Sequence, residues 1–561
     1  MSTPNASEAQ PVLTDEQWRR LSAYGVPAKL PGGTWIFRAG DDACDMILVE
    51  SGRVQIVRPS TSDDDEAVVA SYGRHEFSGE LNILTRQSAY LSARTAEASA
   101  ILRINPTAFR SMMDRDPELS DLVLRALIAR RRSLRDGQAA RSVEIVGSDN
   151  SAAALALRTY AARLQLPHTW NEIDTPTGAA LARAVSASPE DLPVVITPSA
   201  VIRHATPSLL AEHLGLSYRP AGDDEVDLLV IGAGPAGLAA GVYGASEGLQ
   251  TLVLDSVAAG GQAAASSRIE NYLGFTSGIS GAELTATAAV QAQKFGARVA
   301  SPCEVAALRA DGDGVSIVLA DATTVRARAV VIATGAKYRT LPLDRWADFE
   351  GAGIYYAATE IEARACGPHP VAVVGGANSA GQAALYLAGR GSQVTLVVRG
   401  PDLHEGMSSY LADRIVADAN IAVRTGTQVT ALHGDTHLQA ITLAPSTSGV
   451  TSDAAVQTTP GSQECVGLFC FIGATPATAW LDGLATDDHG FLLTDAQLDD
   501  TDLDDRWASL ARRPLPFETS MPRVFAAGDV RAGSMKRVAA AVGEGASAVS
   551  SVHAALRAVS A

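Results

Sequence analysis

The sequence predicts a multidomain α/β protein in which a β-rich roll and a small α/β domain precede two nested units of the strand–turn–helix type. Three observations support this prediction. At 561 residues the chain exceeds what one hydrophobic core can fill. Short strands broken by glycines occupy residues 31–104. An apolar strand that ends in a glycine-rich turn and continues into an alanine-rich helix occurs twice, after Asp227 and after Val371.

Composition and charge limit the class of function. Charged residues make up 19% and hydrophobic residues 47% of the chain, which is the balance of a globular protein. The formal net charge of -17 argues against binding to nucleic-acid phosphates. The chain contains neither a signal-peptide pattern nor an apolar run long enough to cross a bilayer. We therefore expect a cytoplasmic protein with neither a membrane partner nor a nucleic-acid partner.

The chain has five cysteines, which are Cys44, Cys303, Cys366, Cys465 and Cys470. None of them forms a C-x-x-C pair or a zinc-ligand spacing, so no metal site and no disulfide framework are predicted. Cys465 and Cys470 lie in one apolar, strand-like run, where their odd separation directs the side chains to opposite faces. Extended, they are about 17 Å apart, too far for a disulfide. We expect both thiols to be buried and inert.

Residues 1–30 predict a polar tail and a short helix, Thr14–Ala23, with Thr14 as its N-cap. The roll then follows over residues 31–137. Its expected strands are Thr34–Phe37, Asp45–Glu50, Val54–Arg58 and Ala67–Ser71, followed by further strands up to Ile104. Two helices, Pro106–Asp114 and Glu118–Arg135, close this unit.

The roll resembles a cyclic-nucleotide-binding domain of the jelly-roll type, on the basis of its strands, of Gly52 in a turn, and of Gly79-Glu80-Leu81. The resemblance implies that Gly79, Glu80 and Leu81 open a phosphate-binding cassette in which the glutamate holds the ribose 2′-hydroxyl. The family's phosphate arginine falls on Ala89, and Arg86 lies nearby in a different register. Two interpretations stay open: weak cyclic-nucleotide binding with Arg86 as a partial replacement, or a scaffold whose pocket binds another ligand or none.

Residues 142–218 predict a small α/β domain. Its expected strands are Val143–Val146, Val194–Ile196 and Ala200–Arg203, and its expected helices are Ser151–Gln165, Ala179–Val185 and Pro207–Leu214. This order resembles the thioredoxin and glutaredoxin fold, with Leu192-Pro193 at the family's cis-proline position. The family's C-x-x-C is replaced by Asp149-Asn150-Ser151-Ala152, so we expect a docking or spacer domain without thiol chemistry.

The first strand–turn–helix unit contains Gly-x-Gly-x-x-Gly. Gly232 permits a sharp turn off the strand, Gly234 lets backbone amides approach a pyrophosphate, and Gly237 lets the helix pack close to the strand. The helix then directs its N-terminal N–H groups at the phosphates. Asp255 ends the next strand, where an acid holds a ribose hydroxyl. The flanking strand, helix and acid favour dinucleotide binding over a chance glycine-rich turn.

The second unit runs from Val371 to Arg399 and is nested inside the first, a pattern that predicts a flavoprotein with two dinucleotide sites. The order of motifs resembles that of the low-molecular-weight thioredoxin reductases over residues 225–561. This resemblance implies an FAD-binding domain in two parts, 225–345 and 473–561, around a nicotinamide-binding domain at 346–472, and a homodimer. The whole chain also resembles the flavoprotein subunit of alkyl hydroperoxide reductase.

The resemblance also implies the cofactor residues. The residues implied for FAD are Gly232, Gly234, Pro235, Ala236, Gly237, Asp255, Gly261, Gln262, Asn271, Thr334, Gly335, Gly528, Asp529 and Ala539. The residues implied for the nicotinamide dinucleotide are Gly375, Ala377, Asn378, Ser379 and Ala380. Arg399 suits an adenosine 2′-phosphate, although the family's other basic positions fall on Gly400 and His404. NADPH is therefore favoured, with NADH as the alternative and a surface role for Arg399 still open.

One departure from the reductases changes the chemistry. Ala357 and Glu360 occupy the two positions of the redox C-x-x-C, and Cys366 has no local partner. No disulfide can form there, so the reduction of thioredoxin by this route is excluded. Hydride transfer from NAD(P)H to FAD is retained, because related ferredoxin–NADP reductases also lack the C-x-x-C. Glu360 is a weak candidate for a proton donor, and a plain helix-start carboxylate is the alternative.

Two functions follow as hypotheses. The first is an FAD-dependent NAD(P)H oxidoreductase with a non-dithiol acceptor, regulated by a ligand of the roll. In this hypothesis the ligand changes how the nicotinamide-binding domain sits over the flavin, and the thioredoxin-like domain transmits the change. The second is a ligand or redox sensor whose flavoprotein part barely turns over.

Overall fold

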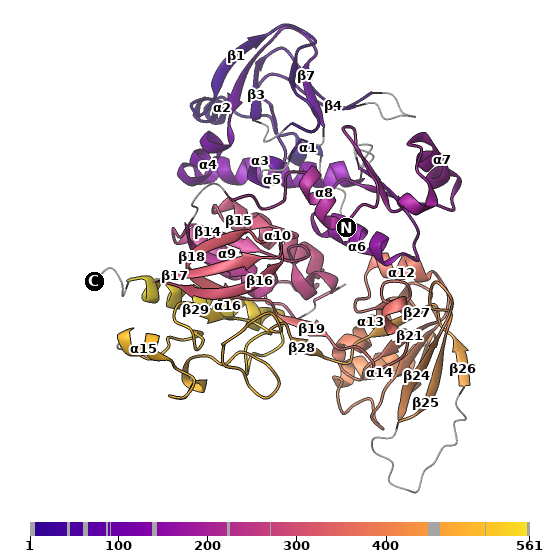
Figure 1. Cartoon of the computed structure of the whole chain (residues 1–561). Coiled ribbons are helices and arrows are strands. Elements are labelled where there is room, and N and C mark those ends of the chain that lie inside the picture. The colour runs from indigo at the N-terminus through magenta and orange to yellow at the C-terminus, as the bar shows by residue number, and fades with distance from the viewer. Residues whose placement is uncertain are drawn as a thin grey trace.

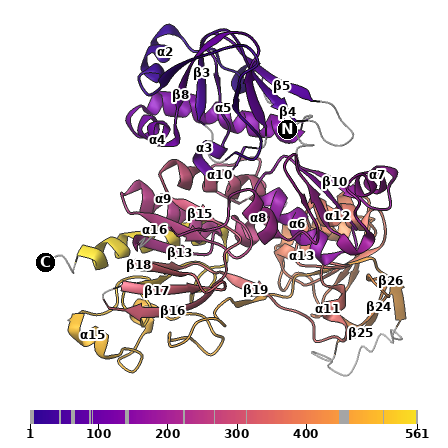
Figure 2. The same cartoon turned by 45° about the horizontal axis from the view of Figure 1, so that its top comes forward.

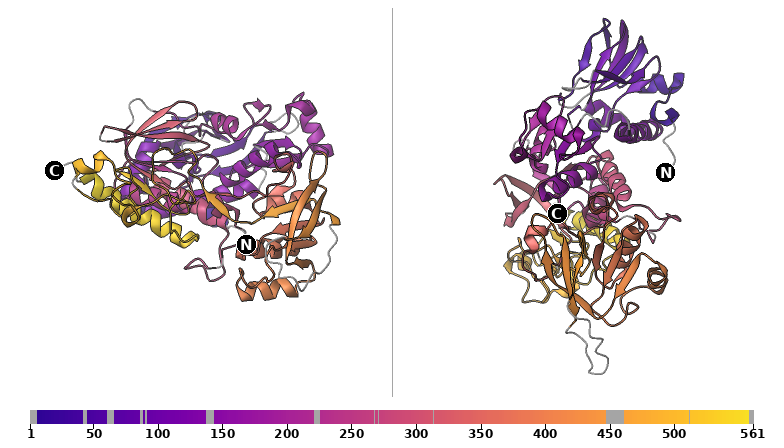
Figure 3. Two further views of the ribbon diagram at one scale, coloured as in Figure 1. Left: turned by 60° about the horizontal axis from the view of Figure 1, so that its bottom comes forward. Right: turned by 90° about the vertical axis from the view of Figure 1, so that its right-hand side faces the viewer.

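A computed structural model describes residues 6–41, 45–59, 66–85, 88–89, 91–136, 143–220, 225–266, 268–269, 271–312, 314–446, 461–510 and 512–557. Four units are distinguished in Figure 1. We call them the roll (6–136), the intermediate domain (143–220), the flavin unit (225–335 and 477–557) and the nicotinamide unit (346–472). The roll is at the top of Figure 1, the flavin unit at lower left and the nicotinamide unit at lower right. The intermediate domain lies between the roll and the two lower units, as the right-hand view of Figure 3 also shows.

The roll consists of two antiparallel four-stranded sheets. One sheet has the order β1 (Val26–Leu30), β8 (Ser99–Ile104), β3 (Met46–Ser51) and β6 (Phe77–Ser78). The other has the order β2 (Trp35–Phe37), β7 (Ser92–Thr95), β4 (Val54–Arg58) and β5 (Ala67–Tyr72). The helices of the roll are α1 (Ala6–Ala9), α2 (Asp15–Ser22), α3 (Asn82–Thr85), α4 (Pro106–Arg115) and α5 (Pro117–Asp136). Thr14 caps α2 as predicted, since its hydroxyl accepts the Gln17 N–H at 3.2 Å.

The intermediate domain has a four-stranded sheet of order β10 (Thr169–Glu172), β9 (Glu144–Gly147), β11 (Val194–Ile196) and β12 (Val201–Ile202). Its helices are α6 (Ala152–Arg163), α7 (Pro176–Ala184) and α8 (Pro207–His213), with a 3-10 turn, η2, at Pro189–Asp191. The Leu192–Pro193 peptide bond is cis, as the sequence predicted. Strand β10, which is short and of mixed polarity, was not predicted from the sequence, and α7 begins earlier than the predicted Ala179. The cap of α7 is Thr175, whose hydroxyl accepts the Gly178 N–H.

The flavin unit is built on a seven-stranded sheet of order β15 (Arg298–Ala300), β14 (Thr251–Leu254), β13 (Glu225–Ile231), β18 (Thr324–Ile332), β17 (Gly314–Leu319) and β16 (Val305–Asp311), with β29 (Val524–Ala526) also paired to β18. Strands β13, β14, β15, β18 and β29 are parallel, as expected for a dinucleotide-binding sheet. The helices are α9 (Pro235–Ser246), α10 (Gly281–Lys294), α15 (Asp505–Leu510) and α16 (Val538–Arg557), with 3-10 turns η3 (Gly261–Ala265) and η4 (Asp495–Gln497).

The nicotinamide unit has a parallel five-stranded sheet of order β20 (Ile354–Tyr355), β27 (Gly467–Cys470), β21 (Val371–Val374), β22 (Val394–Val397) and β23 (Ile421–Arg424). A three-stranded antiparallel sheet, β24 (Thr427–His433), β25 (Ala440–Pro445) and β26 (Gly461–Glu464), lies beside it. The helices are α11 (Trp346–Phe349), α12 (Glu360–Cys366), α13 (Asn378–Gly389) and α14 (Ser409–Ala417). Two paired strands, β19 (Ala336–Tyr338) and β28 (Ala474–Pro476), connect this unit to the flavin unit.

Within the described part of the chain, no helix combines the length and the apolar character that a bilayer span requires.

Candidate functional site

The glycine-rich turn after β13 is shaped by two close backbone approaches. Gly232 has a φ of 104°, and a Cβ atom there would overlap the carbonyl oxygen of Ala333. A Cβ atom on Gly237 would overlap the carbonyl oxygen of Gly232 and lie 3.2 Å from a methyl group of Val230. The geometry therefore agrees with both predicted roles, a sharp turn at Gly232 and close helix–strand packing at Gly237.

Gly234 faces a second glycine from another part of the chain. A Cβ atom on Gly261, in η3, would lie 2.8 Å from the Cα atom of Gly234. A Cβ atom on Gly234 would meet nothing nearer than that loop, at 3.8 Å. Gly234 is also the N-cap of α9 and has no side chain to bond the first N–H groups of the helix. Open space beside uncapped amides fits the pyrophosphate of FAD.

Asp255 follows β14, and its carboxylate accepts three backbone hydrogen bonds. The donors are the N–H groups of Ala233 at 2.7 Å, Val257 at 2.9 Å and Ala258 at 2.9 Å. Burial raises the pKa of Asp255, while these hydrogen bonds and the charge of Arg163 oppose the increase. Asp255 thus connects the glycine-rich turn to the loop after β14. Its contact with a ribose hydroxyl stays a prediction.

Three further predicted residues lie beside this turn. The Gln262 side chain donates to the carbonyl oxygen of Ala336, which ties η3 to β19. The Thr334 hydroxyl donates to the carbonyl oxygen of Ala477 at 3.0 Å, so it joins the two parts of the flavin unit, and Gly335 follows it. By contrast, Asn271 is exposed, and Ala539 is exposed in the first turn of α16. Among the described residues, no side-chain hydrogen bond connects these last two to the turn.

The second part of the flavin unit contacts the start of α9 through the residues that follow β29. A Cβ atom on Gly528 would lie 2.9 Å from the Cβ atom of Ala236, so Gly528 packs on the start of α9. The Gly528 N–H donates to the Glu544 carboxylate at 2.8 Å, and Arg531 pairs with the same carboxylate at 2.8 Å. Burial raises the pKa of Asp529, against the charge of Lys536. Glu544 was not predicted from the sequence, because its partner Gly528 lies 16 residues earlier and no local motif joins the two.

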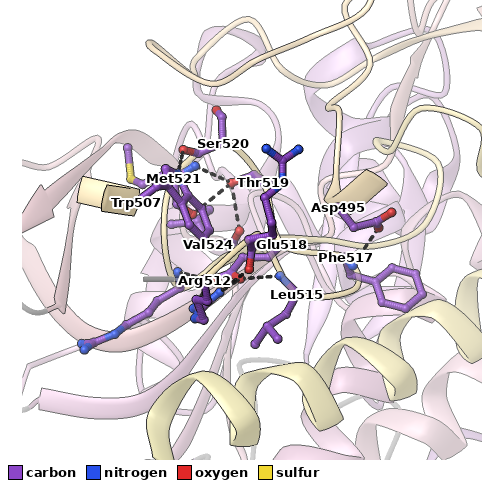
Figure 4. Close-up of polar contacts among 12 residues, drawn as sticks. Asp495, Trp507, Arg512, Leu515, Phe517, Glu518, Thr519, Ser520, Met521 and Val524 are labelled. Atoms are coloured by element: carbon purple, nitrogen blue, oxygen red, sulfur yellow. Dashed lines mark hydrogen bonds and ion pairs between the residues drawn. The ribbon is translucent and has the colours of Figure 1, made fainter. Parts of the chain in front are cut away.

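A buried glutamate stabilises the segment that leads into β29. Glu518 is fully buried, and its carboxylate pairs with Arg512 at 2.6 Å (Figure 4). It also accepts the N–H groups of Leu515 and Arg523, each at 2.8 Å. The neighbouring Thr519 hydroxyl donates to the carbonyl oxygen of Val524 at 2.9 Å (Figure 4). A fully satisfied buried carboxylate thus holds the segment that leads into β29.

The nicotinamide unit has a corresponding turn after β21. A Cβ atom on Gly375 would overlap the carbonyl oxygen of Phe471, so this turn also approaches a neighbouring strand end closely. Ala377 is the N-cap of α13 without a side-chain cap, while Ala377, Asn378 and Ser379 are exposed and Ala380 is buried. The Asn378 side chain accepts the Ser408 N–H at 2.8 Å.

The basic positions of this unit differ in their surroundings. Arg399 follows β22 and is exposed, and no carboxylate of the described residues pairs with it. His404 lies 3.2 Å from Asp402 and 3.6 Å from Asp413. The hydrogen bond to Asp402, followed by that to Asp413, raises the pKa of His404. The Arg399 guanidinium therefore has no carboxylate partner among the described residues, and its contact with an adenosine 2′-phosphate stays a prediction.

At the positions of the missing dithiol, Ala357 precedes α12 and Glu360 begins it. The Glu360 carboxylate pairs with Arg390, accepts from Arg364 at 3.1 Å and accepts from the Tyr386 hydroxyl at 3.3 Å. Burial acts against ionisation of Glu360, but the two arginines together hold its pKa below the usual range. The carboxylate is thus ionised and paired at a helix start, and a proton-donor role stays a prediction.

The four described cysteines are free thiols, and Cys44 lies outside the described residues. Cys366, Cys465 and Cys470 are buried, as expected for the last two. Burial raises the pKa of each of these three thiols, and that of Cys303, to about 12. None of the described thiols is therefore prepared to react as a thiolate.

The roll contains a cavity of about 130 Å³. Gly79, Glu80 and Ala89 line it, whereas Leu81 is buried and is not part of the lining, and Arg86 lies outside the described residues. Arg131 of α5 forms an ion pair with the Glu80 carboxylate. Arg130 also lines the cavity; it donates to the carbonyl oxygens of Ala9, Gly79 and Phe77, and burial lowers its pKa. The sequence did not predict either contact, because the two arginines follow Gly79 and Glu80 by 51 residues and no local motif joins them.

The other walls of the cavity belong to shared cores. Leu91, Ile56, Val69 and Leu134 pack in one hydrophobic cluster with Leu210 and Leu214 of the intermediate domain. In that domain Asp149 pairs with Arg158, and the Arg158 guanidinium lies 4.3 Å from the Trp170 ring centre. An ion pair therefore lies where the resemblance to thioredoxin implies the first cysteine of a C-x-x-C.

Comparison with known proteins gives two family matches. The family model described as pyridine nucleotide-disulphide oxidoreductase matches residues 226–545, and the model described as cyclic nucleotide-binding domain matches residues 27–116. The thioredoxin reductase of Treponema pallidum is 32% identical over 58% of this chain and 95% of its own length. That of Streptomyces clavuligerus is 32% identical over 58% of this chain and 92% of its own. The solved thioredoxin reductase of Lactococcus lactis is 26% identical, with a TM-score of 0.50, over 60% of this chain and all of its own.

Proposed function

Because the chain belongs to the pyridine nucleotide-disulphide oxidoreductase family, we propose that it transfers electrons from NAD(P)H through FAD to an acceptor that is not a dithiol. The chain joins a thioredoxin reductase-like flavoprotein to an N-terminal cyclic-nucleotide-binding domain, which confirms the predicted fold class. The intermediate domain's likeness to thioredoxin stays a prediction. The observation that supports the non-dithiol acceptor is the pair Ala357 and Glu360 in the dithiol positions.

The roles of the chain's residues follow from their positions. FAD, when bound, accepts a hydride and releases electrons singly or in pairs. The amides at Gly234 and the start of α9 are open to receive its pyrophosphate, and Gly261 and Gly528 are close enough to enclose it. Gly375 and the exposed start of α13 receive the nicotinamide dinucleotide, and Arg399 favours NADPH. The homodimer is likewise a proposal from the family.

The experiment that tests this function measures flavin content and anaerobic reduction. The purified protein is expected to carry FAD that NADPH bleaches rapidly and NADH more slowly. Electrons should then reach oxygen, a quinone or a dye, but not added thioredoxin. A Cys366→Ala variant serves as the control for the remaining thiol beside the dithiol positions. NADPH-dependent reduction of thioredoxin by that variant contradicts the proposal, and flavin that NADPH reduces only over minutes supports the sensor instead.

We further propose that a ligand of the roll regulates the flavin site. Asn82 and Ile83 of α3 line the cavity, and α3 packs against α10 of the flavin unit. Helix α10 in turn packs on η3, since a Cβ atom on Gly281 would overlap the carbonyl oxygen of Ala263. This direct contact supplies a second route beside the predicted one through the intermediate domain. A ligand shifts activity only through its different affinities for two arrangements.

Regulation is tested by titrating cyclic AMP and cyclic GMP into wild type, Glu80→Ala and Ala89→Arg. We expect weak binding in wild type, because Ala89 removes a charge-assisted phosphate contact worth about ten- to hundred-fold in affinity. Ala89→Arg should tighten binding, and Glu80→Ala should weaken it. If Ala89→Arg changes nothing, the cassette alignment is wrong. If no nucleotide alters turnover in any variant, the roll is a scaffold or binds another ligand.

A further inference from the structure

Helix α6 of the intermediate domain lies across the junction of the two dinucleotide units. At its start, the Cβ position of Gly351 is 3.0 Å from Ala152, and Leu155 packs on the core of the nicotinamide unit. Figures 1 and 2 both place α6 beside α12. Near its end, the Tyr160 hydroxyl donates to the Ser301 carbonyl oxygen at 2.9 Å, in the flavin unit. Tyr160 also shares a buried cluster with Ala258, which is one of the amide donors to Asp255.

The last residue of α6 is Arg163, which is half-buried at this junction. Arg163 follows Tyr160 by three residues, so it lies on the same face of α6, the face that contacts Ser301 and Ala258 of the flavin unit. Asp255 of the flavin unit, Tyr338 of the connecting strand β19 and Glu362 of the nicotinamide unit are the charged or titratable groups that influence its pKa. Burial lowers the pKa of Arg163, and these three groups oppose the change. A cation from a third domain is therefore placed where the two dinucleotide units meet.

The nearby carboxylates do not use the hydrogen-bond donors of Arg163. Asp255 accepts three amides, and Glu362 accepts the N–H and the hydroxyl of Thr359 in a capping box. Within the described ranges, no hydrogen bond from the Arg163 guanidinium reaches another residue. Five N–H donors in a planar fork are thus left for solvent or for a ligand, and this fork matches phosphate oxygens.

We propose that Arg163 is a cofactor-binding residue supplied by the intermediate domain, and that its guanidinium pairs with the diphosphate of FAD. The turns at Gly234 and Gly261 offer only backbone amides there, and Asp255 adds a negative charge close by, so a full positive charge stabilises the bound diphosphate. This inference rests on the proposed function, and it gives the domain without thiols a role in the flavin site.

The test removes FAD from the full chain and measures its rebinding by flavin fluorescence. Arg163→Gln should weaken FAD binding about ten- to hundred-fold, which is the range for a charge-assisted contact with phosphate. Arg163→Lys, which keeps the charge but not the fork, should lose only several-fold. The matched control is Arg183→Gln, because Arg183 is exposed on α7 of the same domain. Its FAD affinity should equal that of wild type.

Competition by ADP and by adenosine distinguishes a direct contact of Arg163 with the diphosphate from an indirect effect on the packing of the domains. ADP should compete with FAD less well in Arg163→Gln than in wild type, whereas adenosine should compete equally well in both. Equal FAD affinity in Arg163→Gln and wild type overturns the inference, as does an equal loss for ADP and adenosine. If Arg163→Gln does not fold, unchanged FAD affinity in Arg163→Lys overturns it. A wild-type chain that binds no FAD contradicts the proposed function itself.

Discussion

The two dinucleotide units begin with the same strand–turn–helix pattern but enclose it differently. In the flavin unit, the start of α9 is packed from several sides, because Gly528 and Gly545 of the distant second part both press on Ala236. In the nicotinamide unit, the corresponding residues Ala377 and Asn378 are exposed. The first arrangement suits a cofactor that stays bound, and the second suits a co-substrate that exchanges in every turnover.

The residues that follow the second strand of each unit also differ in how firmly their surroundings hold them. Asp255 is tied into the backbone by three amides, so it belongs to a rigid loop. Arg399 is exposed, without a carboxylate partner in the part of the chain that the structure describes. The same motif is thus followed by a carboxylate held by backbone amides in one unit and by an exposed guanidinium in the other, and the difference comes from what packs around each turn.

The largest expected effect concerns how well each of the two turns tolerates a change at the third position of its glycine motif. Gly237→Ala places a Cβ atom on the carbonyl oxygen of Gly232, and backbone on both sides must move. We expect a loss of at least about 3 kcal/mol in the free energy of unfolding, or no soluble protein. The matched change at the equivalent position, Ala380→Gly, should cost only about 1 kcal/mol. Thermal unfolding of both variants measures the difference, and similar losses in the two would contradict it.

The next effect concerns FAD alone. Gly234→Val should fold, since the Cβ position meets nothing nearer than Gly261 at 3.8 Å. The side chain nevertheless fills the space assigned to the pyrophosphate, so we expect at least about a hundred-fold weaker FAD binding. The absorbance of the purified variant near 450 nm, compared with its protein content, measures this. A folded variant with one flavin per chain argues against the assigned site.

A smaller effect should appear in the open unit. Arg399→Gln removes the cation offered to an adenosine 2′-phosphate, so the KM for NADPH should rise about ten-fold while kcat and the KM for NADH stay unchanged. Steady-state kinetics with both dinucleotides provides the measurement. If both KM values rise together, Arg399 acts through the fold of its loop. If neither changes, it is a surface residue.

The smallest effect concerns the cysteine thiols of both units, which we expect not to react with an alkylating reagent in the native protein. Burial raises the pKa of Cys303, Cys366, Cys465 and Cys470 to about 12, so these thiols are protonated at pH 8. In a Cys44→Ser background, iodoacetamide should therefore label the native protein only after unfolding. The raised pKa stabilises the native state below about pH 9, and this stabilisation is lost as the pH rises toward 12. Rapid native labelling at pH 8 would show a reactive thiol.

The sequence alone determined the turns of both dinucleotide units, because the spacing of the glycines after an apolar strand is a local signal. Gly237 is needed by the carbonyl oxygen of Gly232, only a few residues away, whereas the atom that excludes a side chain at Gly232 is the carbonyl oxygen of the distant Ala333. The same holds for the Thr14 cap and for the absence of a dithiol at Ala357 and Glu360. The weakly patterned strand β10 was missed because its sheet partners, not its own residues, make it a strand.

Only the tertiary structure decided which distant residues support those turns. Glu518 and Glu544 act through partners that chain spacing does not reveal. From α5, far along the chain, Arg130 lines the roll's cavity and Arg131 pairs with Glu80. Tyr160 reaches Ser301 of the flavin unit because α6 packs across two other units. Burial and charge at these sites arise from long-range packing, and no local pattern in the chain encodes which segments will meet there.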